Sequence, residues 1–228
     1  MRCNAVSLLD AVLENGPIPP DTAHRADKKR YSELLSKHLA VEVGEGLRGV
    51  GFSGVRPLRG QTGEKGFQGG LGPKKVDVSH ADEQHGLLLA ISITSINFAP
   101  FGKNLKNRFG DLCTEAITLH MRFPYAVVCA LFAFPSEANQ DTTESRVIPT
   151  FERATELLST ISGRTQYTNA GERFENVTMM LYQPVTDGGP DAWVKLFDAD
   201  TRQEISERDY FTRVREIYNA RNPHAPIE

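Results

Sequence analysis

Residues 75–98 read KVDVSHADEQHGLLLAISITSINF, and this stretch decides the predicted fold. Residues 75–79 are expected to form a short strand, and residues 80–86 a polar turn. Residues 87–98 are almost continuously apolar and rich in β-branched side chains, which is typical of a strand buried inside a sheet. The pattern therefore predicts a β-hairpin whose second strand lies in the core of the protein.

The hairpin is followed by a helix and a second buried strand. The helix is predicted over residues 107–122, where Pro124 stops it. Residues 125–134 (YAVVCALFAF) again form an apolar strand, and residues 28–43 show apolar side chains at helical spacing. The other predicted elements are a helix at 6–14, a polar loop at 135–146, a helix at 149–162, strands at 174–183 and 193–198, and a helix at 206–219 with Ser206 as its N-cap. This order predicts an α/β fold, with a mixed central β-sheet sandwiched by helices.

Residues 46–75 differ from the rest of the chain, because they hold ten of its 19 glycines. So many glycines argue against a helix, and we expect a flexible basic segment with two weak strands joined by loops. The positive side chains of this segment are opposed only by Glu64. The length of 228 residues suits a single domain, with a core at about 28–135 and the strands and helices of 136–228 packed on it.

The composition is that of a globular protein, with 39% hydrophobic and 24% charged residues. The formal net charge of −3 is uneven, because residues 1–122 carry a net +3 and residues 123–228 a net −6. Cys3, Cys113 and Cys129 stand at unrelated spacings, which favours a reducing, cytoplasmic compartment. No apolar run approaches the roughly 20 residues that cross a bilayer, and no signal peptide is predicted.

Three polar residues of the predicted hairpin are suited to phosphodiester chemistry. Asp77 lies in the first strand between two valines that would anchor it. Ser92 and Thr94 share one face of the second strand, because residues two apart in a strand point the same way. A nuclease needs acids held at strand ends, since Mg²⁺ prefers carboxylates together with water and phosphate oxygens. Asp77 is therefore a candidate metal ligand.

The order of these features resembles the core of the restriction-endonuclease-like PD-(D/E)xK nuclease superfamily. In that family an Asp begins the hairpin, as Asp77 does here, and the next strand carries Asp/Glu-x-Lys. This chain has Ser92-Ile93-Thr94 at that place. Some restriction endonucleases replace the strand acid by Ser and recruit a Glu from the following helix, which is where Glu115 stands. The resemblance therefore implies a catalytic set of Asp77, Ser92, Thr94 and Glu115.

The resemblance covers roughly residues 28–135 and implies a restriction or phage-defence endonuclease. Asp77, Glu115 and the Ile93 carbonyl would hold Mg²⁺ or Mn²⁺. The expected partner is double-stranded DNA, bound by a homodimer or by a subunit of a defence complex. The basic segment and the loop before the 107–122 helix offer phosphate contacts, although both also suit solvated loops. The candidate DNA-binding residues are Arg56, Arg59, Lys65, Lys74, Lys75, Lys103, Lys106 and Arg108.

Thr94 departs from the family pattern, because a hydroxyl cannot supply the positive charge of a lysine. Three explanations stay open: another lysine substitutes, the protein is a catalytically weakened homologue, or an introduced substitution stands at this position. The candidate substitutes are Lys74, Lys75, Lys103 and Lys106. The alternative function is accordingly a catalytically inactive nuclease-fold subunit for DNA binding or assembly.

Other polar groups carry weaker expectations. Glu33 and Glu42 on the 28–43 helix could add a carboxylate, but they are better interpreted as surface charges, and His120 as packed or exposed. The turn residues His80, Asp82, Glu83 and His85 suggest zinc, yet neighbouring turn side chains diverge, and a solvated turn is favoured. The chain has no P-loop, dinucleotide fingerprint or G-x-S-x-G elbow, which argues against ATP-driven and hydride chemistry.

Overall fold

The computed structural model describes residues 7–61, 65–144 and 146–227, and over these residues the fold is α/β with a six-stranded mixed sheet. Its strands, in their spatial order, are β3 (Val78–Asp82), β4 (Gly86–Ser95), β5 (Val127–Pro135), β6 (Asn176–Gln183), β7 (Trp193–Asp198) and β8 (Glu204–Ile205). The strands β4, β5 and β6 are parallel, whereas the remaining neighbours pair antiparallel. The predicted fold class of a mixed sheet flanked by helices is confirmed.

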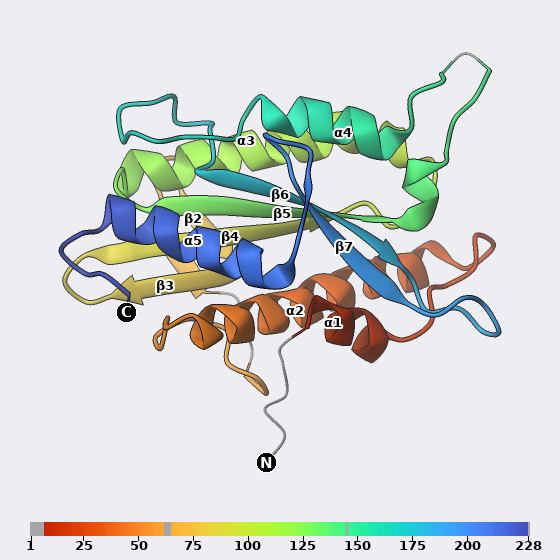
Figure 1. Cartoon of the computed structure of the whole chain (residues 1–228), viewed down its shortest axis with the longest axis horizontal. Helices are drawn as coiled ribbons and strands as arrows, with labels where there is room; N and C mark the ends of the chain where they lie inside the picture. Colours follow the sequence, from red (N-terminus) through yellow and green to blue (C-terminus); the bar gives the residue numbers. More distant parts are fainter. Residues whose placement is uncertain (1–6, 62–64, 145, 228) are drawn as a thin grey trace.

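Helices cover both faces of this open sheet (Figure 1). They are α1 (Leu8–Asn15), α2 (Arg25–Gly49), α3 (Leu105–Arg122), α4 (Thr150–Ser159) and α5 (Glu207–Arg221), with short 3-10 helices η1 (Phe101–Lys103) and η2 (Ser136–Asn139). One core joins α1, α2 and α5 to the sheet, and a second core joins α3 and α4 to its other face. Among the helices of the described residues, none has both the length and the apolar composition needed to cross a bilayer.

The central strand β5 explains why the sequence shows a continuous apolar run. All nine of its residues are buried, and they alternate between the two cores. Cys129 and Leu131 face α5 and α2, while Ala130 and Phe132 face α3 and α4. A strand that is covered on both faces has no solvent-facing position for a polar side chain, so the alternating pattern of a one-sided sheet is lost.

The helix α2 is longer than predicted. The glycines of residues 46–75 argue against a helix there, but α2 continues through Gly49. The physical reason is packing against α5, because a Cβ atom added to Gly46 would lie 2.1 Å from Cζ of Phe211. Glycine lowers helix propensity by about 1 kcal/mol, and here the close approach of two helices offsets that cost.

The remainder of the glycine-rich segment contains the two expected weak strands. They are β1 (Lys65–Gln68) and β2 (Pro73–Val76), which within the described ranges form a separate two-stranded sheet. This hairpin packs on α3, where the Gly70 N–H donates to the Thr118 carbonyl at 2.8 Å. A Cβ atom at Gly70 would come within 2.3 Å of Cβ of Met121, so the missing side chain permits the contact.

Several predicted boundaries were wrong by a few residues. The strand β4 ends at Ser95 rather than 98, because Asn97 leaves the sheet to bind other side chains. The strand β3 continues to Asp82, so the predicted turn at 80–86 is shorter, and α3 begins at Leu105 instead of 107. Ser206 is confirmed as the N-cap of α5, since its hydroxyl accepts from the backbone N–H of Asp209 at 3.1 Å.

Some sequence predictions fall on residues outside the described ranges. They are the helix start at Val6, the thiol of Cys3 and the acid of Glu64.

The strand predicted at 174–183 begins at Asn176, and the strand at 193–198 is confirmed. The pair of residues in β8 was not predicted, because a strand of two residues has no hydrophobic period.

The contact between Gly46 and Phe211 predicts a position-specific loss of stability. We expect Gly46→Ala to lower the free energy of unfolding by about 1–3 kcal/mol, since the added methyl group overpacks the α2–α5 contact. Gly49→Ala is the matched control, because a Cβ atom there meets nothing within 4 Å. Its effect should stay within about 1 kcal/mol. Urea unfolding of both variants measures this, and equal midpoints would contradict the packing argument.

Candidate functional site

Asp77 occupies the bend between β2 and β3, and this bend decides where its carboxylate lies. Val76 packs in the core of α3 and α4, whereas Val78 packs in the core of α1, α2 and α5. In a regular strand these two valines would face the same side, so the chain changes face at Asp77. Asp77 Oδ2 accepts a hydrogen bond from the backbone N–H of Ile93 at 2.7 Å. The carboxylate is thereby fixed to the strand β4.

Glu115 reaches the neighbouring residue of the same strand. The buried hydroxyl of Ser92 donates to Oε1 of Glu115 in a short hydrogen bond. Glu115 lies three residues after Leu112 and four before Leu119, both of which are buried against the sheet. Helical positions three and four apart share a face, so the Glu115 side chain lies on the side of α3 that faces the sheet. The structure therefore attaches Asp77 and Glu115 to consecutive residues of β4.

A lysine from β2 completes this group. Lys74 Nζ lies 2.8 Å from Oε2 of Glu115, so both carboxylate oxygens of Glu115 have partners. The Glu115 side chain is 12% exposed and that of Lys74 is 34% exposed. A charged pair this sheltered is screened less by salt than a pair on the open surface. Lys74, one of the four lysines that could replace the family's lysine, is in ion-pair contact with Glu115.

A cleft of about 960 Å³ opens between α2 and the hairpin strands, and Lys74, Ser92 and Glu115 are not among its lining residues. Asp77 and Thr94 line it, together with Ile93. Its other lining residues are Lys29, Ser32, Glu33, Ser36, Lys37, Ala40, Val41, Pro57, Gly60, Gln61, Lys75, Ser95 and Arg108. Four of the lining side chains are cationic and two are acidic, so the cleft favours an anionic ligand.

A buried polar network fixes the cleft wall. Asn97 is 4% exposed and its amide donates to the hydroxyls of Ser32 and Ser95, each at 2.9 Å. The Tyr182 hydroxyl donates to Oδ1 of Asn97 at 2.9 Å. Burial raises the pKa of Tyr182 well above its usual value, so the phenol keeps the proton that it donates. Sequence reasoning missed Asn97, although a polar residue closing an apolar strand was a visible signal.

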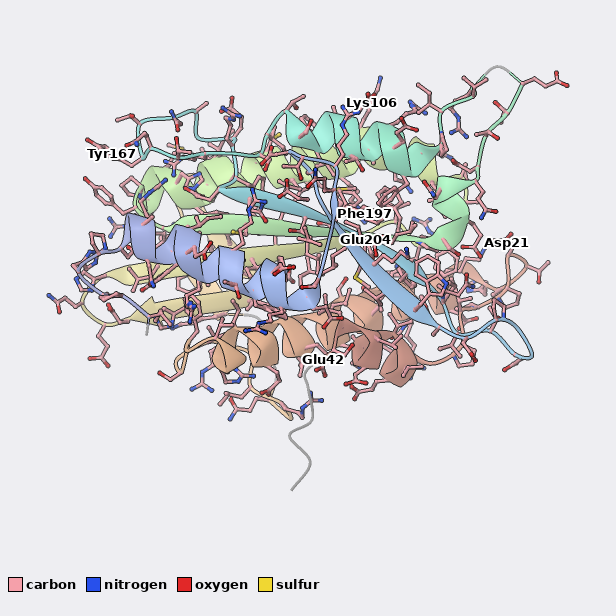
Figure 2. All side chains as sticks on the ribbon, viewed as in Figure 1. Asp21, Glu42, Lys106, Tyr167, Phe197 and Glu204 are labelled. Atoms are coloured by element: carbon pink, nitrogen blue, oxygen red, sulfur yellow. The ribbon has the colours of Figure 1, made fainter. Side chains whose placement is uncertain are left out.

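The remaining candidate DNA-binding residues are dispersed. Lys75 and Arg108 line the cleft, whereas Lys65, Lys103 and Lys106 are exposed and are not among its lining residues. Figure 2 shows Lys106 at the outer surface of the layer that α3 and α4 form. Lys29 and Lys37 of α2 also line the cleft and were not predicted, because their approach to Asp77 depends on how α2 packs on the sheet.

Arg59 and Glu42 form an ion pair instead of contributing to the cleft. Glu42 is buried, and its Oε1 lies 2.6 Å from a guanidinium nitrogen of Arg59. Burial raises the pKa of Glu42, while Arg59 opposes this rise. The interpretation of Glu42 as a surface charge was therefore wrong, because its side chain on α2 is only 1% exposed. Glu33 does line the cleft, and it lies 3.5 Å from Lys29.

Asp82, His85, His80 and His120 each contact another side chain of the protein. The Asp82 and His85 side chains pair at 2.9 Å and are partly exposed, which agrees with a solvated turn. His80 instead packs edge-on against Phe52, and burial lowers the pKa of its imidazole. His120 is packed, as one of the two sequence readings had it, with its Nε2 3.4 Å from a buried carboxylate oxygen of Glu175. None of these histidines lies among the residues that line the cleft.

The oxygen atoms available at the hairpin are of the kind that a hard cation binds. Carboxylates and a backbone carbonyl are ligands that Mg²⁺ accepts, and Mg²⁺ is commonly held by one or two carboxylates plus water. Within the described residues, no group of three or more His, Cys, Asp or Glu side chains could hold a metal ion. The two carboxylates held on adjacent residues of β4 are those of Asp77 and Glu115. The chain matches none of the protein-family models, curated proteins or solved structures with which it was compared.

The pair of Arg59 and Glu42 predicts a stability effect without an effect on the cleft. We expect Arg59→Ala to lower the free energy of unfolding by about 1–3 kcal/mol, because it leaves the Glu42 carboxylate buried without its cation. Adding Glu42→Gln should recover most of the loss, since the uncharged amide needs no counter-ion. Arg56→Ala serves as control, because that side chain is exposed and bonds to Gln61. A loss in urea unfolding that is equal for both arginines would refute the assignment.

Proposed function

We propose that this protein is a Mg²⁺-dependent DNA endonuclease of the restriction-endonuclease-like PD-(D/E)xK type. The observation that supports the proposal best is the attachment of Asp77 and Glu115 to adjacent residues of β4, with Asp77 lining a cleft that holds four cationic side chains. The sequence resemblance named the same acids. The proposal includes a cytoplasmic protein that acts on double-stranded DNA as a homodimer or within a defence complex.

The chain's own residues would divide the work as follows. Asp77, Glu115 and the Ile93 carbonyl would hold Mg²⁺ or Mn²⁺, which supplies charge stabilisation at the scissile phosphate and a more acidic bound water. Lys29, Lys37, Lys75 and Arg108 would bind the phosphate backbone along the cleft. The network around Asn97 would hold α2 at a fixed distance from the end of β4. Such preorganisation lets fixed charges act without moving during the reaction.

A second candidate is a nuclease-fold subunit that binds DNA without cleaving it. Two observations favour it. Thr94 supplies a hydroxyl where the family has a lysine. The Lys74 ammonium group contacts Oε2 of Glu115, a carboxylate oxygen that would otherwise be available to a metal ion. Both candidates predict DNA binding in the cleft. They differ in whether phosphodiester bonds are broken.

Plasmid nicking with Mg²⁺ or Mn²⁺ separates the two candidates. For an active nuclease we expect Asp77→Ala to reduce the nicking rate by about 100-fold or more, because a metal ligand is lost. Glu152→Gln on α4 is the control, since that acid is exposed and does not line the cleft. It should nick at the wild-type rate. Nicking that Asp77→Ala leaves intact would refute the assigned site.

The variant Thr94→Lys tests the missing cation in the same assay. A lysine at this place would restore the family's positive charge on the face of β4 that carries Ser92. We expect faster nicking than in the wild type, and the increase should disappear when Asp77→Ala is added. A wild type that stays inactive while Thr94→Lys cleaves identifies the second candidate. Inactivity of both, with DNA binding retained, identifies it as well.

Salt-dependent DNA binding tests the cleft itself. Removing one phosphate contact should weaken binding to any duplex sequence and reduce the slope of log affinity against log salt by about 1. We expect this for Lys37→Ala, whose side chain lines the cleft. Lys195→Ala is the matched control, because Lys195 lies on β7 and pairs with Glu204. Absence of salt-sensitive affinity in the wild type would favour a binder of small molecules instead.

A further inference from the structure

The ion pair of Lys74 and Glu115 has a specific position within the proposed metal site. Glu115 has two carboxylate oxygens, of which Oε1 accepts from Ser92 and Oε2 contacts Lys74. Ser92 is buried at 1% exposure, so its hydroxyl is a fixed part of the strand. Lys74 is the more exposed partner and reaches the acid from outside the main sheet. Oε2 is therefore the oxygen that another cation can reach by exchanging with Lys74.

The position of Lys74 on the β1–β2 hairpin favours such an exchange. Lys74 stands on β2, which pairs with β1 among the described residues and forms no strand ladder there with the six-stranded sheet. The hairpin rests on α3 through Gly70 and through an edge contact between Phe67 and Phe123. The long side chain of lysine also has several rotatable bonds, so the ammonium group can leave Glu115 without movement of the backbone.

The charges of Lys74 and of a divalent cation oppose their binding to Glu115 at the same time. Without a metal ion, the Lys74 ammonium neutralises a carboxylate that is 12% exposed and would otherwise carry an unpaired charge. A divalent cation bound by the same carboxylate would be repelled by an ammonium group that stays 2.8 Å from Oε2. The two cations therefore bind Glu115 in competition.

We propose that Lys74 is a built-in competitor for the divalent cation, pairing with Glu115 in the metal-free protein and leaving it when metal binds. This regulation rests on the proposed metal site. It assigns Lys74 a positioning and gating part at the Glu115 carboxylate, distinct from a phosphate contact. The affinity of the site for metal is then set by the strength of an internal ion pair.

Calorimetric titration of Mn²⁺ into the whole protein tests the competition without any need for activity. We expect Lys74→Met, which keeps the length of the side chain and removes its charge, to bind Mn²⁺ about tenfold more tightly or better. Lys74→Arg should restore affinity close to the wild type. Lys106→Met is the matched control, because it removes an exposed positive charge from the helix that carries Glu115. Its affinity should stay within about twofold of the wild type.

The outcomes separate this inference from the proposed function. Tighter binding in Lys74→Met, lost again when Glu115→Gln is added, supports the competition. Binding that appears only in Lys74→Met supports it as well, and assigns the wild type to the non-cleaving candidate. Equal or weaker binding in Lys74→Met overturns the inference and leaves the metal site standing. An absence of Mn²⁺ binding in wild type, Lys74→Met and Lys74→Arg alike overturns both.

Discussion

The arrangement depends on one constraint, which is that two carboxylates are fixed to adjacent residues of a buried strand. The backbone N–H of Ile93 holds Asp77, and the hydroxyl of Ser92 holds Glu115. Because β4 lies between β3 and β5 and is buried on both faces, it cannot shift without disturbing both cores. A buried strand of this kind fixes the positions of Asp77, which lies at a bend, and Glu115, which lies on α3.

The bend at Asp77 has consequences on both of its sides. It turns β3 into the sheet and leaves β2 in a separate hairpin that packs on α3. The same change of face places Lys74 against Glu115 and places Asp77 at the edge of the cleft. The positions of Asp77, Lys74 and the cleft thus all depend on the bend at Asp77, where the β1–β2 hairpin ends and the six-stranded sheet begins.

The cleft depends in turn on how α2 is held. Gly46 lets α2 approach α5, and the network around Asn97 joins Ser32 of α2 to the end of β4. The C-terminal end of the helix is therefore placed by close packing, and its N-terminal half by a buried hydrogen bond at Ser32. Residues between these contacts, such as Lys37, are left facing the cleft. Packing of α2 on α5 and hydrogen bonds in the cleft wall thereby position α2 opposite Asp77.

The sequence alone determined the fold class, a mixed sheet covered by helices, and offered Asp77 and Glu115 as candidate acids. Long apolar runs in β4 and β5 can only be satisfied inside a sheet covered on both faces, and Glu115 follows buried positions at helical spacing. The sequence could not show that α2 runs through Gly49, because the benefit of Gly46 comes from Phe211, 165 positions away. Nor could it choose among the lysines, since the contact of Lys74 with Glu115 requires the hairpin to fold onto α3. Such contacts join distant parts of the chain, and only tertiary packing decides them.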